Sequence, residues 1–126
     1  MKVLVVEDNT LNAKFADAVL RRLGHQVDFA HNGKVGVEKF LNNDYDLILM
    51  DIQMPVMNGL EAASKIREYE EQMGVKNRIP IIAITAFAME HDRDNCIAAG
   101  MDEYMTKPYR PADLEKMIDK VMSKYR

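Results

Sequence analysis

The apolar positions of this chain fall into five short runs that are typical of β-strands. Three of them, at residues 3–6, 47–50 and 81–84, are continuous stretches of aliphatic residues and methionine. Such runs indicate strands that are covered on both faces, as in a parallel sheet. The runs at 27–30 and 103–105 mix apolar with polar residues. We therefore expect those two to be shorter strands or strands at the edges of the sheet.

Segments with a helical period separate these runs. Leu11, Phe15, Val19 and Leu23 recur every four residues, and Gly24 follows as a helix stop. Further helices are predicted over residues 35–41, over 59–73 with the polar stretch 68–72 as an exposed end, before Gly100, and from Pro111 to Tyr125. Strand and helix thus alternate five times. With right-handed crossovers this alternation predicts an open parallel sheet with helices on both faces.

Composition narrows the class of protein. A length of 126 residues with 48% hydrophobic residues fits one folded domain, residues 1–126. The net charge of -3 argues against nucleic acid as the main partner, which needs a basic field. The sequence has neither a signal-peptide stretch nor an apolar run long enough to cross a bilayer. The single cysteine, Cys96, is interpreted as a packing residue, and we expect a cytoplasmic protein in a reducing compartment.

Polar residues follow four of the five predicted strands directly. Glu7 and Asp8 follow the first strand, Asp51 the third, Thr85 the fourth and Lys107 the fifth. In open α/β sheets, ligands bind at the carboxyl ends of the strands. We therefore expect three carboxylates, one hydroxyl and one ammonium to meet at a single edge of the sheet.

That combination of groups suits phosphoryl transfer. Each close pair of carboxylates costs on the order of a few kcal/mol, so the cluster needs a dication, a lysine or a proton. Mg²⁺ fits best, because it prefers oxygen ligands and keeps waters that a phosphate can replace. Lys107 adds a fixed positive charge and Thr85 a neutral donor for phosphoryl oxygens. The attacking carboxylate would be Asp51, which would become an aspartyl phosphate.

Over essentially its whole length the chain resembles the response-regulator receiver family. The matching stretches are Val5–Asn9, Leu49–Gly59, Ile82–Ala86 and Gly100–Pro108. Glu7 replaces the Asp that is frequent at its position, and Glu7-Asp8-Asn9 together with residues 50–55 is similar to receivers of hybrid sensor histidine kinases. The resemblance implies a five-stranded, doubly wound (βα)5 fold with flavodoxin-like strand order 2-1-3-4-5, and a role in two-component signal transduction.

The resemblance also implies a role for each site residue. Asp51 would accept the phosphoryl group from a histidine kinase or a histidine phosphotransfer protein. Asp8, Asp51 and the backbone carbonyl of Gln53 would bind Mg²⁺, and Glu7 would act through a metal-bound water. Lys107 would pair with the phosphoryl oxygens, and the bond from Lys107 to Pro108 is expected to be cis.

Signal output is implied by the same resemblance. Thr85, helped by the Ala86 amide, would bind the phosphoryl group, and Tyr104 would then turn inward as the switch aromatic. The changed surface would be that of the fourth helix, fifth strand and fifth helix, roughly residues 87–125, which would bind a downstream protein. Gln53 and Phe87 would tune the water that hydrolyses the aspartyl phosphate. The chain would thus assist its own phosphorylation and dephosphorylation without being an enzyme in the usual sense.

Three other functions stay open at this point. An aspartyl phosphatase would want a second Asp where Gln53 stands, and a flavin-binding module would want a hydroxyl- or glycine-rich loop where Glu7-Asp8-Asn9 stands. A scaffold that binds partners without phosphorylation is opposed by the intact set of site residues. Oligomeric state, and the choice between a stand-alone regulator and a receiver cut from a hybrid kinase, are also open.

Overall fold

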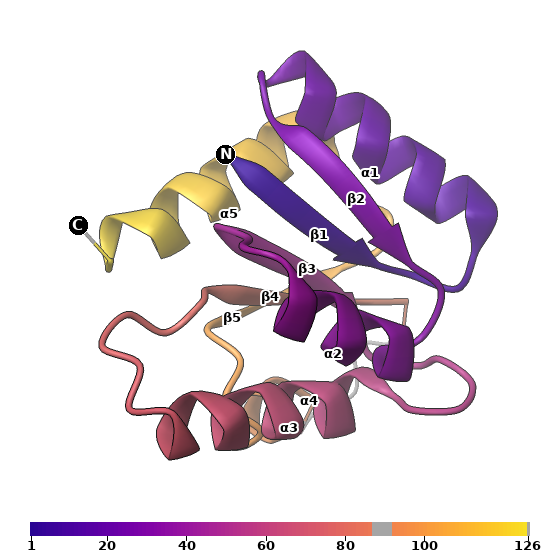
Figure 1. Ribbon diagram of the computed structural model, residues 1–126. Helices are drawn as coiled ribbons and strands as arrows, with labels where there is room; N and C mark the ends of the chain where they lie inside the picture. The colour runs from indigo at the N-terminus through magenta and orange to yellow at the C-terminus, as the bar shows by residue number, and fades with distance from the viewer. Residues whose placement is uncertain (87–91, 126) are drawn as a thin grey trace.

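A five-stranded parallel sheet forms the centre of the protein (Figure 1). The structure, a computed structural model, describes residues 1–86 and 92–125. The strands are β1 (Lys2–Val6), β2 (Gln26–Ala30), β3 (Leu47–Asp51), β4 (Ile81–Thr85) and β5 (Glu103–Thr106), in the order β2-β1-β3-β4-β5. This order and the parallel pairing confirm the predicted fold. The two mixed runs form the edge strands, β2 and β5, as expected.

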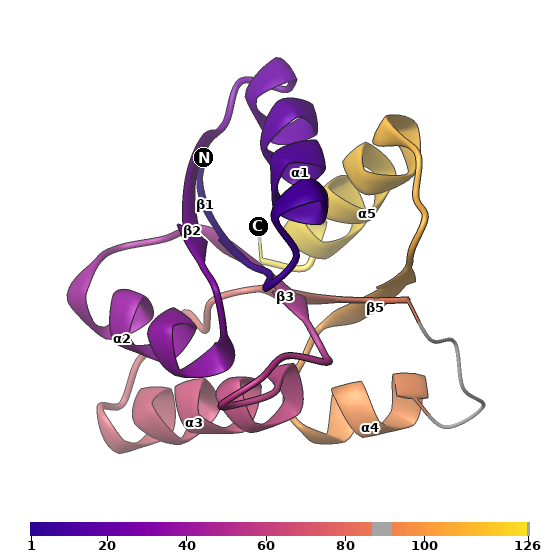
Figure 2. The ribbon, with the colours of Figure 1, turned by 90° about the vertical axis from the view of Figure 1, so that its right-hand side faces the viewer.

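Helices cover both faces of the sheet (Figure 2). They are α1 (Thr10–Arg22), α2 (Gly33–Asn42), α3 (Gly59–Gln72), α4 (Asp92–Ala98) and α5 (Pro111–Ser123). α1 and α5 pack on one face, while α2, α3 and α4 pack on the other. None of the helices within the described residues is long and apolar enough to cross a membrane.

The continuous apolar runs arise because successive residues of a strand point to opposite faces. In β1, Val3 and Val5 pack in the layer under α1 and α5, whereas Leu4 and Val6 pack in the layer under α2, α3 and α4. β3 and β4 alternate in the same way. Cys96 of α4 is fully buried in the second layer, and burial raises the pKa of its thiol to about 11. This burial confirms Cys96 as a packing residue.

Three helices begin at asparagine caps next to the carboxyl edge of the sheet. The side chains of Asn9, Asn32 and Asn58 each accept a hydrogen bond from the backbone amide three residues later, at 2.9–3.0 Å. Each bond satisfies an amide that the first turn of a helix leaves unpaired. Local sequence thus fixes where α1, α2 and α3 begin, and all three begin close to the ends of strands.

The prediction that residues 68–72 form an exposed end of α3 is wrong at Glu70, whose exposed fraction is 4%. Its carboxylate accepts bonds from Arg67 Nη1 at 2.6 Å and from the backbone amide of Ile79 at 2.7 Å. Arg67 also donates to Asp102 Oδ2 at 3.0 Å and to the carbonyl of Gly100 at 2.8 Å. The ion pair and these hydrogen bonds allow a charged side chain to be buried where α3, β4 and the chain before β5 meet.

The apolar stripe of α1 is buried only in part. Val19 lies in the core, whereas Leu11 is 76% exposed and Phe15 is 43% exposed. The Phe15 ring contacts the ring of Tyr109 with 5.2 Å between centroids. The first turns of α1 therefore leave apolar surface beside the carboxyl edge of the sheet.

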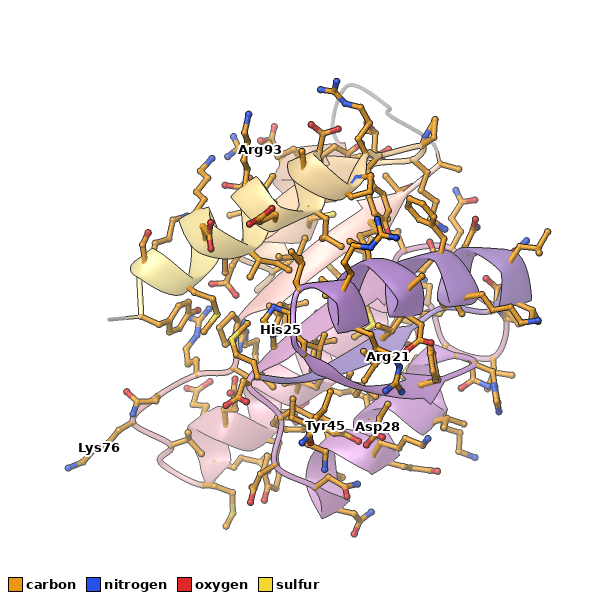
Figure 3. The ribbon with its side chains drawn as sticks, turned by 90° about the horizontal axis from the view of Figure 1, so that it is seen from above. Arg21, His25, Asp28, Tyr45, Lys76 and Arg93 are labelled. Carbon is orange, nitrogen blue, oxygen red and sulfur yellow. The ribbon has the colours of Figure 1, made fainter. Side chains whose placement is uncertain are left out.

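The opposite end of the sheet is held by a polar contact between two segments. The Tyr45 hydroxyl, just before β3, donates to Asp28 Oδ2 of β2 at 2.9 Å (Figure 3). Partial burial and this bond raise the pKa of Tyr45 to about 12. The ammonium of Lys2 lies 5.1 Å from the centre of the Tyr45 ring. These contacts lie at the end of the molecule away from the carboxyl edge.

Candidate functional site

The carboxyl ends of β1 and β3 bring three acidic residues together. Glu7 and Asp8 follow β1, and Asp51 is the last residue of β3, which pairs with β1. Each of the three offers a carboxylate oxygen, and these oxygens all lie within 4.8 Å of one another. Asp8 is exposed, Glu7 is half-buried and Asp51 is buried, with an exposed fraction of 7%. The predicted convergence of these residues is therefore present in the structure.

Lys107, the residue directly after β5, completes the cluster. Its ammonium pairs with Glu7 Oε1 and lies 3.5 Å from Asp51 Oδ2. Its backbone amide donates to the carbonyl of Thr85 at 2.7 Å, so the end of β4 positions the residue that bears the ammonium. The peptide bond from Lys107 to Pro108 is cis, as predicted.

The electrostatics of the cluster shift the pKa values of Asp51 and Glu7 in opposite directions. Burial, together with a hydrogen bond to Glu7 and the charge of Glu7, raises the pKa of Asp51 to about 7. Burial also opposes ionisation of Glu7, yet hydrogen bonds with Asp51 and Lys107 and the charge of Lys107 hold the pKa of Glu7 below its usual value. One lysine therefore does not neutralise the cluster, and a further positive charge would stabilise it.

The remaining predicted site residues lie around this cluster. Thr85 is buried at the end of β4, and Ala86 after it is exposed. Gln53 is exposed in the turn two residues after Asp51. Tyr104 of β5 is half-buried and packs against the layer under α2, α3 and α4. Phe87, and with it the start of the predicted output surface at residues 87–91, lies outside the described residues.

A cavity of about 580 Å³ opens beside the acidic cluster. Its lining joins polar groups of the site to an apolar wall from α1, β3, β4 and the chain after β5: Val6, Glu7, Asn12, Phe15, Ala16, Leu49, Asp51, Ile84, Ala86, Lys107, Pro108 and Tyr109. Sequence reasoning missed Asn12, Phe15 and Tyr109 as part of this site. The signal for Tyr109 was its place directly after Lys107 and Pro108, because a residue next to a site loop is held near the site.

Gly59 allows the first turn of α3 to approach the backbone of Asp51 closely. A Cβ at this position would collide with the backbone carbonyl of Asp51. The Gly59 amide donates to the carbonyl of Ile52 at 2.8 Å, which closes the connection of residues 53–58 into a loop at the end of β3. Glycine is therefore required here for close backbone approach.

The model of the response regulator receiver domain matches residues 3–119, which is most of the chain, and the chain belongs to this family. Receivers of this family act in two-component signal transduction, and the family is not one of conventional enzymes.

Curated relatives are much longer proteins. The chain is 48% identical over 122 residues to the hybrid signal transduction histidine kinase G of Dictyostelium discoideum, covering 95% of this chain and 4% of that protein. It is 43% identical over 129 residues to hybrid kinase I of the same organism, covering 98% of this chain and 7% of the relative. Histidine kinase 5 of Arabidopsis thaliana is 35% identical over 143 residues, which cover 96% of this chain and 16% of that protein. The chain thus spans a small part of each relative.

Solved receivers share the fold closely. One is the receiver domain of a Saccharomyces cerevisiae response regulator, crystallised with a histidine phosphotransfer signalling protein; it has a TM-score of 0.90 and 33% identity, covering 96% of this chain and 88% of that one. Another is the receiver of a Pseudomonas aeruginosa sensor histidine kinase, with magnesium in its active-site cleft; it has a TM-score of 0.85 and 38% identity, covering 97% of both chains.

Proposed function

We propose that this receiver takes a phosphoryl group from a phosphohistidine onto Asp51, with Mg²⁺ bound beside it. The observation that carries the proposal is the convergence of three carboxylates within 4.8 Å, with the Lys107 ammonium 3.5 Å from Asp51. Such a cluster attracts a hard dication, and the dication together with Lys107 would then attract an incoming phosphoryl group.

The donor set fits Mg²⁺. It consists of carboxylate oxygens, and the pKa of Asp51 is raised by burial and by the neighbouring Glu7 despite the charge of Lys107. Asp8, Asp51 and the backbone carbonyl of Gln53 would hold the ion, and Glu7 would act through a metal-bound water. When bound, Mg²⁺ would neutralise the carboxylates and offer coordination to phosphoryl oxygens. Support from outside the chain is the magnesium ion in the similar receiver of Pseudomonas aeruginosa.

The transfer itself requires a nucleophile, positive charge and donors. A carboxylate oxygen of Asp51 attacks phosphorus in line with the leaving imidazole, so the O–P bond forms as the P–N bond of the phosphohistidine breaks. Lys107 pairs with the phosphoryl oxygens, and the Thr85 hydroxyl and Ala86 amide, at the end of β4, donate to them. Hydrolysis of the same acyl phosphate, assisted by the chain in cis, reverses the modification.

The readout that we propose is a shift of the α4-β5-α5 surface, of which residues 92–125 are described. Engagement of Thr85 by the phosphoryl group favours a state in which Tyr104 turns inward. Glu103, the neighbour of Tyr104, is paired with Arg93 of α4 at 3.4 Å and with Lys120 of α5 at 3.0 Å. A movement of β5 would therefore be transmitted to α4 and α5, where a downstream protein would bind.

The phosphodonor that we propose is a histidine kinase or a histidine phosphotransfer protein. This is supported by the similar yeast receiver, which was crystallised with such a phosphotransfer protein, and by the hybrid kinases among the relatives. Direct nucleic-acid and membrane contacts form no part of this proposal. A cytoplasmic location stays a prediction.

The test is phosphorylation by acetyl phosphate with Mg²⁺, followed by intact-mass measurement. We expect the mass of one added phosphoryl group, lost in Asp51→Asn and on chelation of the metal. Asp44→Asn, at an exposed position before β3, is the matched control and should be phosphorylated normally. Failure of the wild type to gain mass would overturn the proposal, and partner binding unaffected by Asp51→Asn would favour a scaffold that works without phosphorylation.

A further inference from the structure

Val56, in the connection between β3 and α3, has a backbone conformation that valine rarely adopts. Its φ is 69°, and the backbone amide of Met57 donates to the carbonyl of Pro55 at 2.7 Å across it. Val56 is therefore the central residue of a γ-turn with positive φ, the rarer and more strained of the two γ-turn forms. A β-branched side chain adds to the cost, whereas Gly or Asn would adopt this conformation more easily.

Burial does not offset this cost, because the Val56 side chain is 77% exposed. The turn is held by backbone bonds on either side of it. The carbonyl of Met57 accepts a hydrogen bond from the amide of Gly33 at 2.9 Å. The amide of Gly59 donates a hydrogen bond to the carbonyl of Ile52 at 2.8 Å. These bonds do not involve the side chain at position 56. Valine therefore contributes strain and little packing to the folded chain, and its apolar surface faces outward.

The place of Val56 suggests what it contacts. The connection that bears it starts and ends at the backbone beside Asp51. Leu11, on the first turn of α1, is 76% exposed, and within the described residues these two are the most exposed large hydrophobic side chains. Figure 2 shows the starts of α1 and of the β3–α3 connection at the same edge of the sheet. Val56 and Leu11 therefore place exposed apolar side chains on two segments at the edge of the sheet that carries Asp51.

We propose that Val56 is a recognition residue for the phosphohistidine-bearing protein: it contacts apolar surface of a histidine phosphotransfer protein that presents its phosphohistidine to Asp51. This inference rests on the proposed function. A protein donor has to cover the edge of the sheet around Asp51 in order to bring its histidine into line, and Val56 stands on that edge. The similar yeast receiver, crystallised with a histidine phosphotransfer protein, indicates the class of partner. A small phosphodonor reaches Asp51 without needing Val56.

The experiment compares two donors on the same variants. Val56→Asn removes the apolar surface and relieves the strain, and Val56→Thr keeps the branched shape while adding a hydroxyl. Val75→Asn, at an exposed valine away from the carboxyl edge, is the matched control. The donors are acetyl phosphate with Mg²⁺ and the phosphorylated histidine phosphotransfer protein of Saccharomyces cerevisiae.

We expect Val56→Asn to slow transfer from the protein donor about tenfold at limiting receiver concentration, as the loss of one buried aliphatic contact implies. Val56→Thr should show a smaller loss, and Val75→Asn none. Rates with acetyl phosphate should be the same in all four proteins. The urea midpoint of Val56→Asn should equal or exceed that of the wild type, because the strain is relieved.

Equal slowing with both donors would mean that Val56 shapes the site rather than contacting a partner, and would overturn the inference. Unchanged transfer from the protein donor in Val56→Asn would also overturn it. If the wild type accepts phosphate from acetyl phosphate but not from the phosphotransfer protein, the inference fails while the proposed function stands. If the wild type accepts from neither donor, the proposed function fails with it.

Discussion

The ammonium of Lys107 pairs with Glu7, although Asp51 lies only 3.5 Å from it. The lysine is thus shared between a carboxyl whose pKa is lowered and one whose pKa is raised to about 7. Glu7 thereby competes with Asp51 for the fixed positive charge of the site. In the absence of metal, Asp51, the proposed nucleophile, is the less well compensated of the two carboxyls.

Glu7→Gln should release Lys107 towards Asp51. Burial is the largest cause of the raised pKa of Asp51, and a hydrogen bond with Glu7 and the charge of Glu7 add to it, so loss of that charge should lower the pKa. The ¹³C chemical shift of the Asp51 carboxyl, followed by NMR through a pH titration without metal, measures this. Mg²⁺ binding should weaken roughly tenfold, since Glu7 orients a metal-bound water in the proposed site. An unchanged Asp51 titration would show that the coupling to Glu7 is unimportant.

Asp51→Asn should stabilise the protein in the absence of divalent metal. At pH 8 the wild-type carboxyl is ionised in a buried site beside Glu7, and a neutral amide avoids that cost, which we place at about 1–2 kcal/mol. Urea unfolding with chelator measures the gain. Mg²⁺ should raise the urea midpoint of the wild type and leave that of the variant almost unchanged. A variant less stable than the wild type at pH 8 would contradict this explanation.

The stability of the metal-free protein should depend on pH through the same group. The unfolded carboxyl loses its proton near pH 3.8, whereas the folded Asp51 keeps its proton up to about pH 7. Between these values the folded state binds more protons, so the free energy of unfolding contributed by Asp51 falls as pH rises. Chelated wild type should therefore lose stability between about pH 4 and 7 relative to Asp51→Asn, as thermal unfolding across that range would show.

Arg67→Met should destabilise the protein by about 3–5 kcal/mol, because it leaves the buried Glu70 without its cation and removes the nearer of the two arginines that pair with the half-buried Asp102. Arg67 donates to Glu70 at 2.6 Å and to Asp102 at 3.0 Å, and its side chain is 13% exposed. Urea unfolding gives the difference. Arg110→Met is the control, because Arg110 also pairs with a carboxylate but its side chain is 83% exposed. Equal effects of the two substitutions would contradict the role of burial.

Gly59→Ala should disturb both stability and the site. The added Cβ would meet the backbone carbonyl of Asp51, so the end of β3 or the start of α3 has to move. We expect a loss of about 2–4 kcal/mol in unfolding free energy and slower phosphorylation by acetyl phosphate. Gly74→Ala offers a contrast, since a Cβ there meets no atom within 4 Å and only its positive φ is strained. The Gly74 variant should keep the wild-type phosphorylation rate.

Several features of the molecule could be predicted because they depend on local sequence. The apolar runs specify strands, and the two mixed runs, predicted to be edge strands or shorter strands, form the edges β2 and β5. The convergence of Asp8, Asp51 and Lys107 follows from parallel strands, whose carboxyl ends share one edge. Glu70 was misjudged because its burial depends on the amide of Ile79 and on Arg67, whose side chain also bonds to Asp102, and both Ile79 and Asp102 lie outside α3.

The sequence by itself therefore determined the strands, the helix starts at asparagine caps and the identity of the charged groups at the carboxyl edge. Each of these follows from side-chain chemistry, from short continuous apolar runs or from a period of about four residues. Only the tertiary structure decided that Lys107 pairs with Glu7 as well as Asp51, that Phe15 and Tyr109 form one wall of the cavity, and that Val56 is strained and exposed. These relationships depend on distances between segments far apart in the chain, which no local pattern encodes.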